Sequence, residues 1–247
     1  MMHGVLPEPL LRCENCAVRN QAVCGAMDAQ QITRLNAIAR RRKLVAGQTI
    51  MSDQDKAEFF ANVVSGTVKL TKTMPDGRQQ IVGLLFSPDF LGRAYSPNNP
   101  YFAEAATDVE ICCFPHDAFE KLINEFPDLQ SRLFERTLDE LDAARDWMLL
   151  LGRKTAEEKV SSFLMLLARR SLLINCAEPQ TPQPSQFELP LTRTDMADYL
   201  GLTIETVSRQ LTKLKTRGLI RIVNNRLVQV TDTERLAAIA GQDSDAA

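Results

Sequence analysis

The chain has 247 residues, of which 45% are hydrophobic and 24% are charged, a composition typical of folded globular proteins. At about 100–200 residues per domain, this length allows one large or two modest domains. No apolar segment is long enough to span a bilayer, and the N-terminus lacks the basic and apolar regions of a signal peptide. We therefore expect a cytoplasmic protein with no membrane partner.

Positive charge is concentrated near the C-terminus. Over the whole chain, 29 Lys and Arg residues nearly balance 31 Asp and Glu residues. Residues 204–226, in contrast, carry six basic side chains and one acidic side chain. This local excess indicates a specific segment that contacts a polyanion, and the overall balance argues against indiscriminate binding.

Three of the six cysteines, Cys13, Cys16 and Cys24, lie within twelve residues near the N-terminus. In a reducing compartment, clustered cysteines bind metal or do redox chemistry more often than they form disulfides. Four thiolates suit a structural zinc or an iron–sulfur cluster, and the spacing alone does not choose between them. A fourth ligand must come from elsewhere, and the candidates are Cys112, Cys113, Cys176, His3 and His116.

Residues 47–114 carry short apolar segments separated by Gly and Pro, with a hairpin turn at Pro75-Asp76-Gly77. This pattern predicts a small antiparallel roll or barrel, preceded by a short helix over Ala29–Arg42. Cys112 and Cys113 are adjacent in an expected strand, so their side chains point to opposite faces. One can face the N-terminal cysteines while the other packs in the roll as a small hydrophobe. Cys176 begins a proline-rich loop, and we expect no role for it.

From about Pro115 the apolar period becomes helical, and one long helix is expected to end at Gly152. Two apolar stripes on this helix indicate two neighbours, one of which can be the same helix of a second subunit. An ordinary bundle helix buried on both sides is the alternative. The residues expected in the dimer seam are Phe134, Leu141, Ala144, Met148 and Leu151.

Residues 191–230 predict a helix-turn-helix followed by a two-stranded wing. Thr194 is expected to cap the first helix, Gly201 to end it, and Thr203 to cap the second helix. We therefore expect this segment to bind duplex DNA. The outward residues of the second helix can contact base edges or phosphates, and they are Glu205, Ser208, Arg209, Thr212 and Lys213.

Taken together, the chain from Cys13 to about Ala240 resembles the cAMP receptor protein/FNR (CRP/FNR) superfamily of bacterial transcription regulators. Besides the cysteines and the long helix, the segments that carry the resemblance are Val64–Val68, Asp89–Gly92 and Glu205–Arg209. The branch it is most similar to is the FNR type, in particular FnrL-like proteins, which are oxygen-responsive regulators of anaerobic gene expression.

The resemblance implies an α+β fold with an N-terminal antiparallel β-roll of the cupin or cyclic-nucleotide-binding kind. A long dimerisation helix and a C-terminal winged helix-turn-helix follow. The implied domains are residues 1–28 as a cysteine-rich cluster-binding arm, 29–127 as the β-roll sensor domain, 128–152 as the dimerisation helix and 153–247 as the DNA-binding domain.

The resemblance also implies a cofactor and partners. Cys13, Cys16, Cys24 and Cys112 match the ligands of a [4Fe-4S] cluster, with Cys113 as the fallback for the fourth. Oxygen would be the signal, and the cluster-loaded homodimer would bind a palindrome of TTGAT-type half-sites through the Glu-x-x-Ser-Arg motif. The hairpin at residues 74–78 is similar to a loop that contacts RNA polymerase in relatives.

Two other functions are less well supported. Nucleotide-binding members of the superfamily carry a Gly-Glu pair and an Arg-Ser or Arg-Thr pair, where this chain has Gly92-Arg93 and Asn99-Pro100, so we expect no cyclic nucleotide. No catalytic triad or phosphate-binding loop is evident, so we expect no enzyme.

The main alternative is a zinc-stabilised or constitutive DNA-binding regulator of the same fold that does not sense oxygen.

Overall fold

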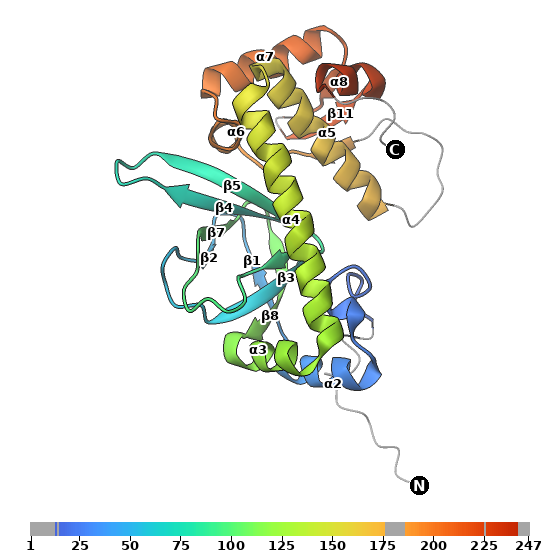
Figure 1. Cartoon of the computed structure of the whole chain (residues 1–247). Coiled ribbons are helices and arrows are strands. Elements are labelled where there is room, and N and C mark those ends of the chain that lie inside the picture. Colours follow the sequence, from blue (N-terminus) through green and yellow to red (C-terminus); the bar gives the residue numbers. More distant parts are fainter. Residues whose placement is uncertain (1–12, 14, 176–185, 225, 242–247) are drawn as a thin grey trace. The chain divides into compact units, whose positions relative to one another are not determined.

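The computed structural model describes residues 13, 15–175, 186–224 and 226–241 (Figure 1). Cys176 and one Asn of the expected wing turn lie outside these residues. The chain divides into two compact units, Met1–Ala143 and Ala144–Ala247. The division into four parts expected from the sequence stays a prediction. Within the described residues, none of the helices combines the length and the apolar character needed to cross a bilayer.

Two four-stranded antiparallel sheets form the roll of the first unit. Their strand orders are β1-β8-β3-β6 and β2-β7-β4-β5. Apolar residues from both sheets pack together in the core, among them the fully buried Val63, Val68 and Ile111. This core confirms the expected antiparallel β-roll. The strands are β1 (Arg40–Leu44), β2 (Thr49–Met51), β3 (Phe59–Ser65), β4 (Thr67–Thr73), β5 (Gln79–Phe86), β6 (Phe90–Leu91), β7 (Phe102–Ala105) and β8 (Val109–Pro115).

The sequence predicts a helix over Ala29–Arg42. In the structure the last residues of this range belong to strand β1 instead. Asp28 caps helix α2 (Ala29–Ile38), because its side chain accepts hydrogen bonds from two backbone N–H groups of the first turn, both at 2.8 Å. The helix then stops, and Arg40–Leu44 pairs with β8 along its whole length. The helical expectation for residues 39–42 is wrong, because pairing with β8 satisfies these backbone groups and overrides the local apolar period.

Helix α3 (His116–Glu125) leads into α4 (Pro127–Arg153), the longest described helix, which crosses the boundary between the two units. Helix α4 continues through Gly152, where the sequence predicts its end. A glycine inside a helix costs only about 1 kcal/mol, which neighbouring residues can offset. The residues of the expected dimer seam are exposed or half-buried in the single chain: Phe134, Leu141, Ala144, Met148 and Leu151.

The second unit contains the expected helix-turn-helix. Thr192, and not the expected Thr194, caps α6, because its hydroxyl accepts from the backbone N–H of Asp195, whose carboxylate accepts in return from the Thr192 backbone N–H. Gly201 ends α6 with φ 60° and ψ 46°, and Thr203 caps α7. A strand before the helix-turn-helix joins the wing, so the sheet has the order β10-β11-β9. The elements are α5 (Ala156–Asn175), β9 (Gln186–Glu188), α6 (Arg193–Leu200), α7 (Ile204–Thr216), β10 (Ile220–Ile222), β11 (Leu227–Val230) and α8 (Thr233–Ile239).

Candidate metal centre and nucleic-acid interface

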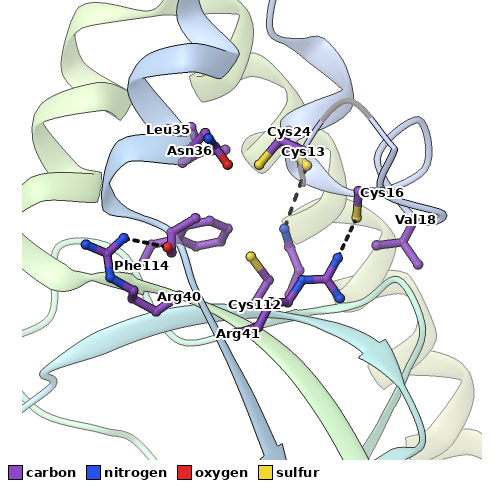
Figure 2. A pocket seen from close by; sticks show the side chains of 12 residues that line it. Cys13, Cys16, Val18, Cys24, Leu35, Asn36, Arg40, Arg41, Cys112 and Phe114 are labelled. Atoms are coloured by element: carbon purple, nitrogen blue, oxygen red, sulfur yellow. Dashed lines mark hydrogen bonds between the residues drawn. The ribbon is translucent and has the colours of Figure 1, made fainter. Parts of the chain in front are cut away.

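Three cysteines near the N-terminus and one cysteine almost ninety residues later border one cavity in the first unit (Figure 2). Cys13, Cys16 and Cys24 come from the N-terminal arm (residues 13–28), and Cys112 comes from β8. Apolar side chains of the arm, α2 and β8 form part of the cavity wall. Asparagine and arginine side chains form the rest of it. None of the five cysteines in the described part of the chain forms a disulfide.

The arm is held in the first unit by a buried side chain and by a hydrogen bond from a side chain of α4. Its short 3₁₀ helix η1 (Val23–Ala26) carries the third cysteine, and Val23 is almost fully buried. A Cβ at Gly25 would lie 2.7 Å from the carbonyl oxygen of Asn20, so this turn accepts only glycine without rearrangement. On the other side, Arg136 of α4 donates a hydrogen bond of 2.6 Å to the carbonyl oxygen of Gln21. These contacts place the arm cysteines against the rest of the first unit.

The register of the sheet places Cys112 between two polar residues of neighbouring strands. Cys112 is opposite Arg41 of β1 and opposite Asn62 of β3. Directly opposed residues of an antiparallel pair have their side chains on the same face, and all three residues line the cavity. Cys113 faces the other side and is buried in the core of the roll. Cys112, and not the fallback Cys113, is therefore the cysteine of β8 that lies with the arm cysteines.

Burial and the repulsion of neighbouring cysteines raise the pKa of Cys13, Cys24 and Cys112. Burial and, to a lesser extent, the nearby Cys16 and Cys13 together raise the pKa of Cys24 to about 11. The pKa of Cys112 is raised to about 12, mainly by burial and also by the three arm cysteines, although Arg41 acts in the opposite direction. The four sulfurs thus form one electrostatically coupled group. A metal or cluster that takes up thiolates would relieve the repulsion.

Among the described residues, however, no group of three or more Cys, His, Asp or Glu side chains is arranged to hold a metal ion. The four cysteines nevertheless border one cavity, so a bound group is defined by the donor set that they supply and not by a preformed metal geometry.

Two residues that the sequence did not single out complete the cavity. Arg41 donates a hydrogen bond of 3.2 Å from Nη2 to Cys16 Sγ and one of 2.8 Å from Nη1 to Glu110 Oε1. Asn62 Nδ2 lies 4.0 Å from Cys24 Sγ, and Asn62 Oδ1 is buried with no hydrogen-bond partner among the described residues. The sequence carries no local signal for either residue, because both reach the cavity only through the pairing of distant strands.

Helix α7 presents the residues expected to contact DNA. Its apolar residues Val207, Leu211 and Leu214 are buried in the second unit. The opposite face is polar, and hydrogen bonds from the Glu205 backbone N–H and the Thr203 side chain at the start of the helix lower the pKa of Glu205. The five expected DNA-contacting residues are all exposed: Glu205, Ser208, Arg209, Thr212 and Lys213.

Among the described residues, Lys213 is the one of these five with an acidic partner. Glu157 of α5 forms ion pairs with both Lys213 and Arg217, one through each carboxylate oxygen. Two of the cations near the end of α7 are therefore partly neutralised. The sequence did not indicate this role for Glu157.

The remaining sequence predictions concern the roll. The hairpin at residues 74–78 is closed by a backbone hydrogen bond of 2.8 Å from Met74 to Arg78, and the Met74 side chain is half exposed. At the position expected to lack a nucleotide-phosphate ligand, the Asn99 side chain is buried and donates to the Ser52 carbonyl oxygen at 3.2 Å. A polymerase contact at the hairpin and the absence of a bound nucleotide stay predictions.

Comparison with known proteins agrees with both halves of this architecture. Residues 41–126 match the family model of the cyclic nucleotide-binding domain, and residues 158–239 match that of the Crp-like helix-turn-helix domain. The first match describes the roll, and the second covers the helix-turn-helix and the wing.

Relatives match over nearly the whole chain. A probable transcriptional activator of Rhizobium leguminosarum bv. viciae is 50% identical over 91% of each chain. The transcriptional activator protein FnrL of Cereibacter sphaeroides is 49% identical over 99% of this chain and 97% of its own. The solved structure of FixK2 from Bradyrhizobium japonicum superposes with a TM-score of 0.73 at 33% identity, covering 85% of this chain and all of that chain. These proteins are regulators and not enzymes, and the chain belongs to the CRP/FNR family of DNA-binding transcription regulators.

Proposed function

We propose that this regulator senses oxygen through a [4Fe-4S] cluster held by Cys13, Cys16, Cys24 and Cys112. As a cluster-loaded homodimer, it would bind a palindrome of TTGAT-type half-sites and control anaerobic gene expression. The observation that supports this most strongly is the convergence of three arm cysteines and one strand cysteine on a single cavity. The relatives named as activators, FnrL among them, support the regulatory part of the proposal.

The donor set fits such a cluster. Four cysteine thiolates are the usual ligands of a [4Fe-4S] cluster, and they bind four different irons. Four cysteines that border one cavity supply this donor set. When bound, the cluster would supply an oxygen-labile link between the arm and β8.

The chain's own residues provide the path from this site to α4. The arm contacts α4 through the hydrogen bond from Arg136 to the Gln21 carbonyl oxygen. Helix α4 carries the exposed apolar residues of the expected seam, with Phe134 and Met148 each 63% exposed. A change in the position of the arm can thus alter the part of α4 available to a second subunit. Only a few kcal/mol are needed to shift such an equilibrium.

Dimer formation would place two copies of α7 for a two-fold symmetric site. Half-sites of such palindromes are spaced by about 34 Å, one turn of DNA. Arg209 can bond guanine through O6 and N7, and Glu205 can accept a hydrogen bond from cytosine N4. Both side chains are exposed on α7.

Metal analysis tests the proposal directly. The protein is purified without air, and its iron, sulfide and zinc contents are measured together with its visible absorption, before and after exposure to air. We expect about four irons and four sulfides per chain, the composition of the cluster, and a colour that fades in air. One zinc per chain and no colour would instead support the alternative, a zinc-stabilised or constitutive regulator.

A further inference from the structure

We propose that Arg41, held by Glu110, is a positioning residue that sets the reduction potential of the cysteine site through a charged hydrogen bond to Cys16. This inference rests on the proposed function, because the quantity that it concerns is a property of the bound cluster. It adds to that function a residue outside the ligand set. The geometry that carries it lies within the first unit (Figure 2).

The position of Arg41 follows from the pairing of β1 with β8. Arg41 is directly opposite Cys112, and Glu110 precedes Cys112 by two residues, so the three side chains share one face of the sheet. Glu110 is the diagonal neighbour of Arg41, within reach of a long side chain. The sheet therefore holds Arg41 next to Cys112, and the Arg41 side chain points toward Cys16 of the arm.

The guanidinium group makes two directed contacts at once. Nη1 donates to Glu110 Oε1 at 2.8 Å, and Nη2 donates to Cys16 Sγ at 3.2 Å. Since the guanidinium is planar and rigid, the carboxylate that holds one nitrogen also orients the other toward the sulfur. The Arg41 and Glu110 side chains are each only 28% exposed, so solvent screens this pair less than a fully exposed one.

The neighbouring arginines have different partners. Arg40 donates to the carbonyl oxygens of Ala37 and Ala39 at the end of α2. Arg42 lies over the ring of Phe59, 5.3 Å from its centroid, and its charge acts on Cys113 on the other face. Only the middle residue of the three donates to a cysteine of the cavity. Arg42 therefore provides a matched control with the same charge, in the same strand.

A positive hydrogen-bond donor at a ligand sulfur favours the more negative oxidation state of a thiolate-ligated cluster. Hydrogen bonds to sulfur, net charge and exposure are the main factors that set the potential of an iron–sulfur site. The couple concerned adds one electron to the cluster and breaks no bond. Removal of the Arg41 charge should therefore lower the potential and strengthen the bond between iron and Cys16 sulfur.

The test compares Arg41→Gln, Arg41→Lys, Glu110→Gln and Arg42→Gln with the wild-type protein, all purified without air. Iron and sulfide analysis establishes that each holds the cluster. Protein-film voltammetry then gives the potential, and resonance Raman spectroscopy gives the iron–cysteine stretching bands. We expect Arg41→Gln to lower the potential and move a stretching band to higher frequency, and Arg42→Gln to leave both unchanged. Arg41→Lys should fall in between, since it keeps the charge but loses the oriented fork. Glu110→Gln also loses the orientation of Arg41, so its stretching band should fall in between, but it removes an anion as well, which by itself raises the potential.

Several outcomes would overturn the inference. A filled Arg41→Gln site with the wild-type potential and bands would show that Arg41 has no such role. Equal shifts in Arg41→Gln and Arg42→Gln would show a general effect of charge. If Arg41→Gln fails to hold the cluster, the test relies on Arg41→Lys and Glu110→Gln. A wild-type potential and wild-type stretching bands in both variants would then reject the positioning role of Arg41. A wild-type protein with no cluster would overturn the proposed function and this inference with it.

Discussion

Cys112 and Cys113 are consecutive residues of β8 that face opposite sides of one sheet. Cys112 borders the cavity with the three arm cysteines, whereas Cys113 is buried among the apolar residues of the roll core. The alternation of side chains along a strand separates two chemically identical groups into different environments. A pair of matched substitutions can therefore distinguish a ligand from a core residue.

We expect Cys112→Ser to abolish cluster binding and Cys113→Ser to retain it. A serine hydroxyl is a poor substitute for a thiolate ligand, so the iron content of the first variant should fall to background. The second variant replaces a buried sulfur with a hydroxyl in an apolar core, which costs roughly 1–3 kcal/mol of stability but removes no ligand. Iron content and thermal unfolding are measured on both. Full iron in Cys112→Ser and none in Cys113→Ser would reverse the assignment.

The arm cysteines should behave like Cys112. Cys16→Ser is the most informative of them, because it also removes the sulfur that accepts from Arg41. We expect it to lose the cluster and, with it, the difference in DNA binding between anaerobic and air-exposed protein. That difference is measured by gel shift on a TTGAT-type palindrome. A variant that still responded to air would contradict a ligand role for Cys16.

Local patterns in the sequence predicted the main elements, because the alternation of strands and the helical period are both short-range features. The same logic predicted which face of α7 is exposed, since buried positions such as Val207 and Leu211 determine the opposite face. It also predicted that the side chains of the two cysteines of β8 point to opposite faces of the sheet.

The residues around the site could not be predicted in this way. The apolar period of Ile32 and Leu35 continues to Ala39, so the arginines that follow read as the end of a helix. What places Arg41 opposite Cys112 is pairing with a strand about seventy residues away, a contact with no local signature. The ion pairs of Glu157 with α7 likewise join residues of two different helices. Long-range pairing, and not local preference, determines these parts of the sites.

Glu157→Gln should strengthen DNA binding. It would release Lys213 and Arg217 from their acidic partner and make both cations available for phosphates. Each added phosphate contact steepens the dependence of log K on log salt by about 0.9. We therefore expect a slope steeper by up to about two, measured by fluorescence anisotropy at several salt concentrations. Glu234→Gln on α8 removes an equal charge as the control, and equal slopes in the two variants would contradict the effect.

Arg209→Ala should reduce sequence preference more than general affinity. Arg209 is exposed on α7, and its guanidinium also donates to Thr206 Oγ1 at 3.4 Å, which directs it along the recognition face. A bidentate contact to guanine contributes about 1–3 kcal/mol of discrimination. Competition between a TTGAT-type site and unrelated duplex DNA measures this quantity. Lys215→Ala, from the same helix, should weaken binding to both duplexes equally, and an unchanged preference in Arg209→Ala would refute its role in base recognition.

Met148→Glu should shift the protein toward the monomer without unfolding it. The Met148 side chain is 63% exposed in the single chain, so a carboxylate at this position is solvated in the monomer. In a symmetric dimer, the same substitution would bury two carboxylates in an apolar seam and remove the burial of two side chains, each contributing about 1.5–3 kcal/mol. Since about 1.4 kcal/mol corresponds to a tenfold change, the dissociation constant should rise well over tenfold. Val45→Glu makes the same change at a residue of the roll that is 60% exposed, and it should leave the dimer intact. Sedimentation equilibrium of both variants without air measures the constant, and a wild-type value for Met148→Glu would place the subunit contact elsewhere than this face of α4.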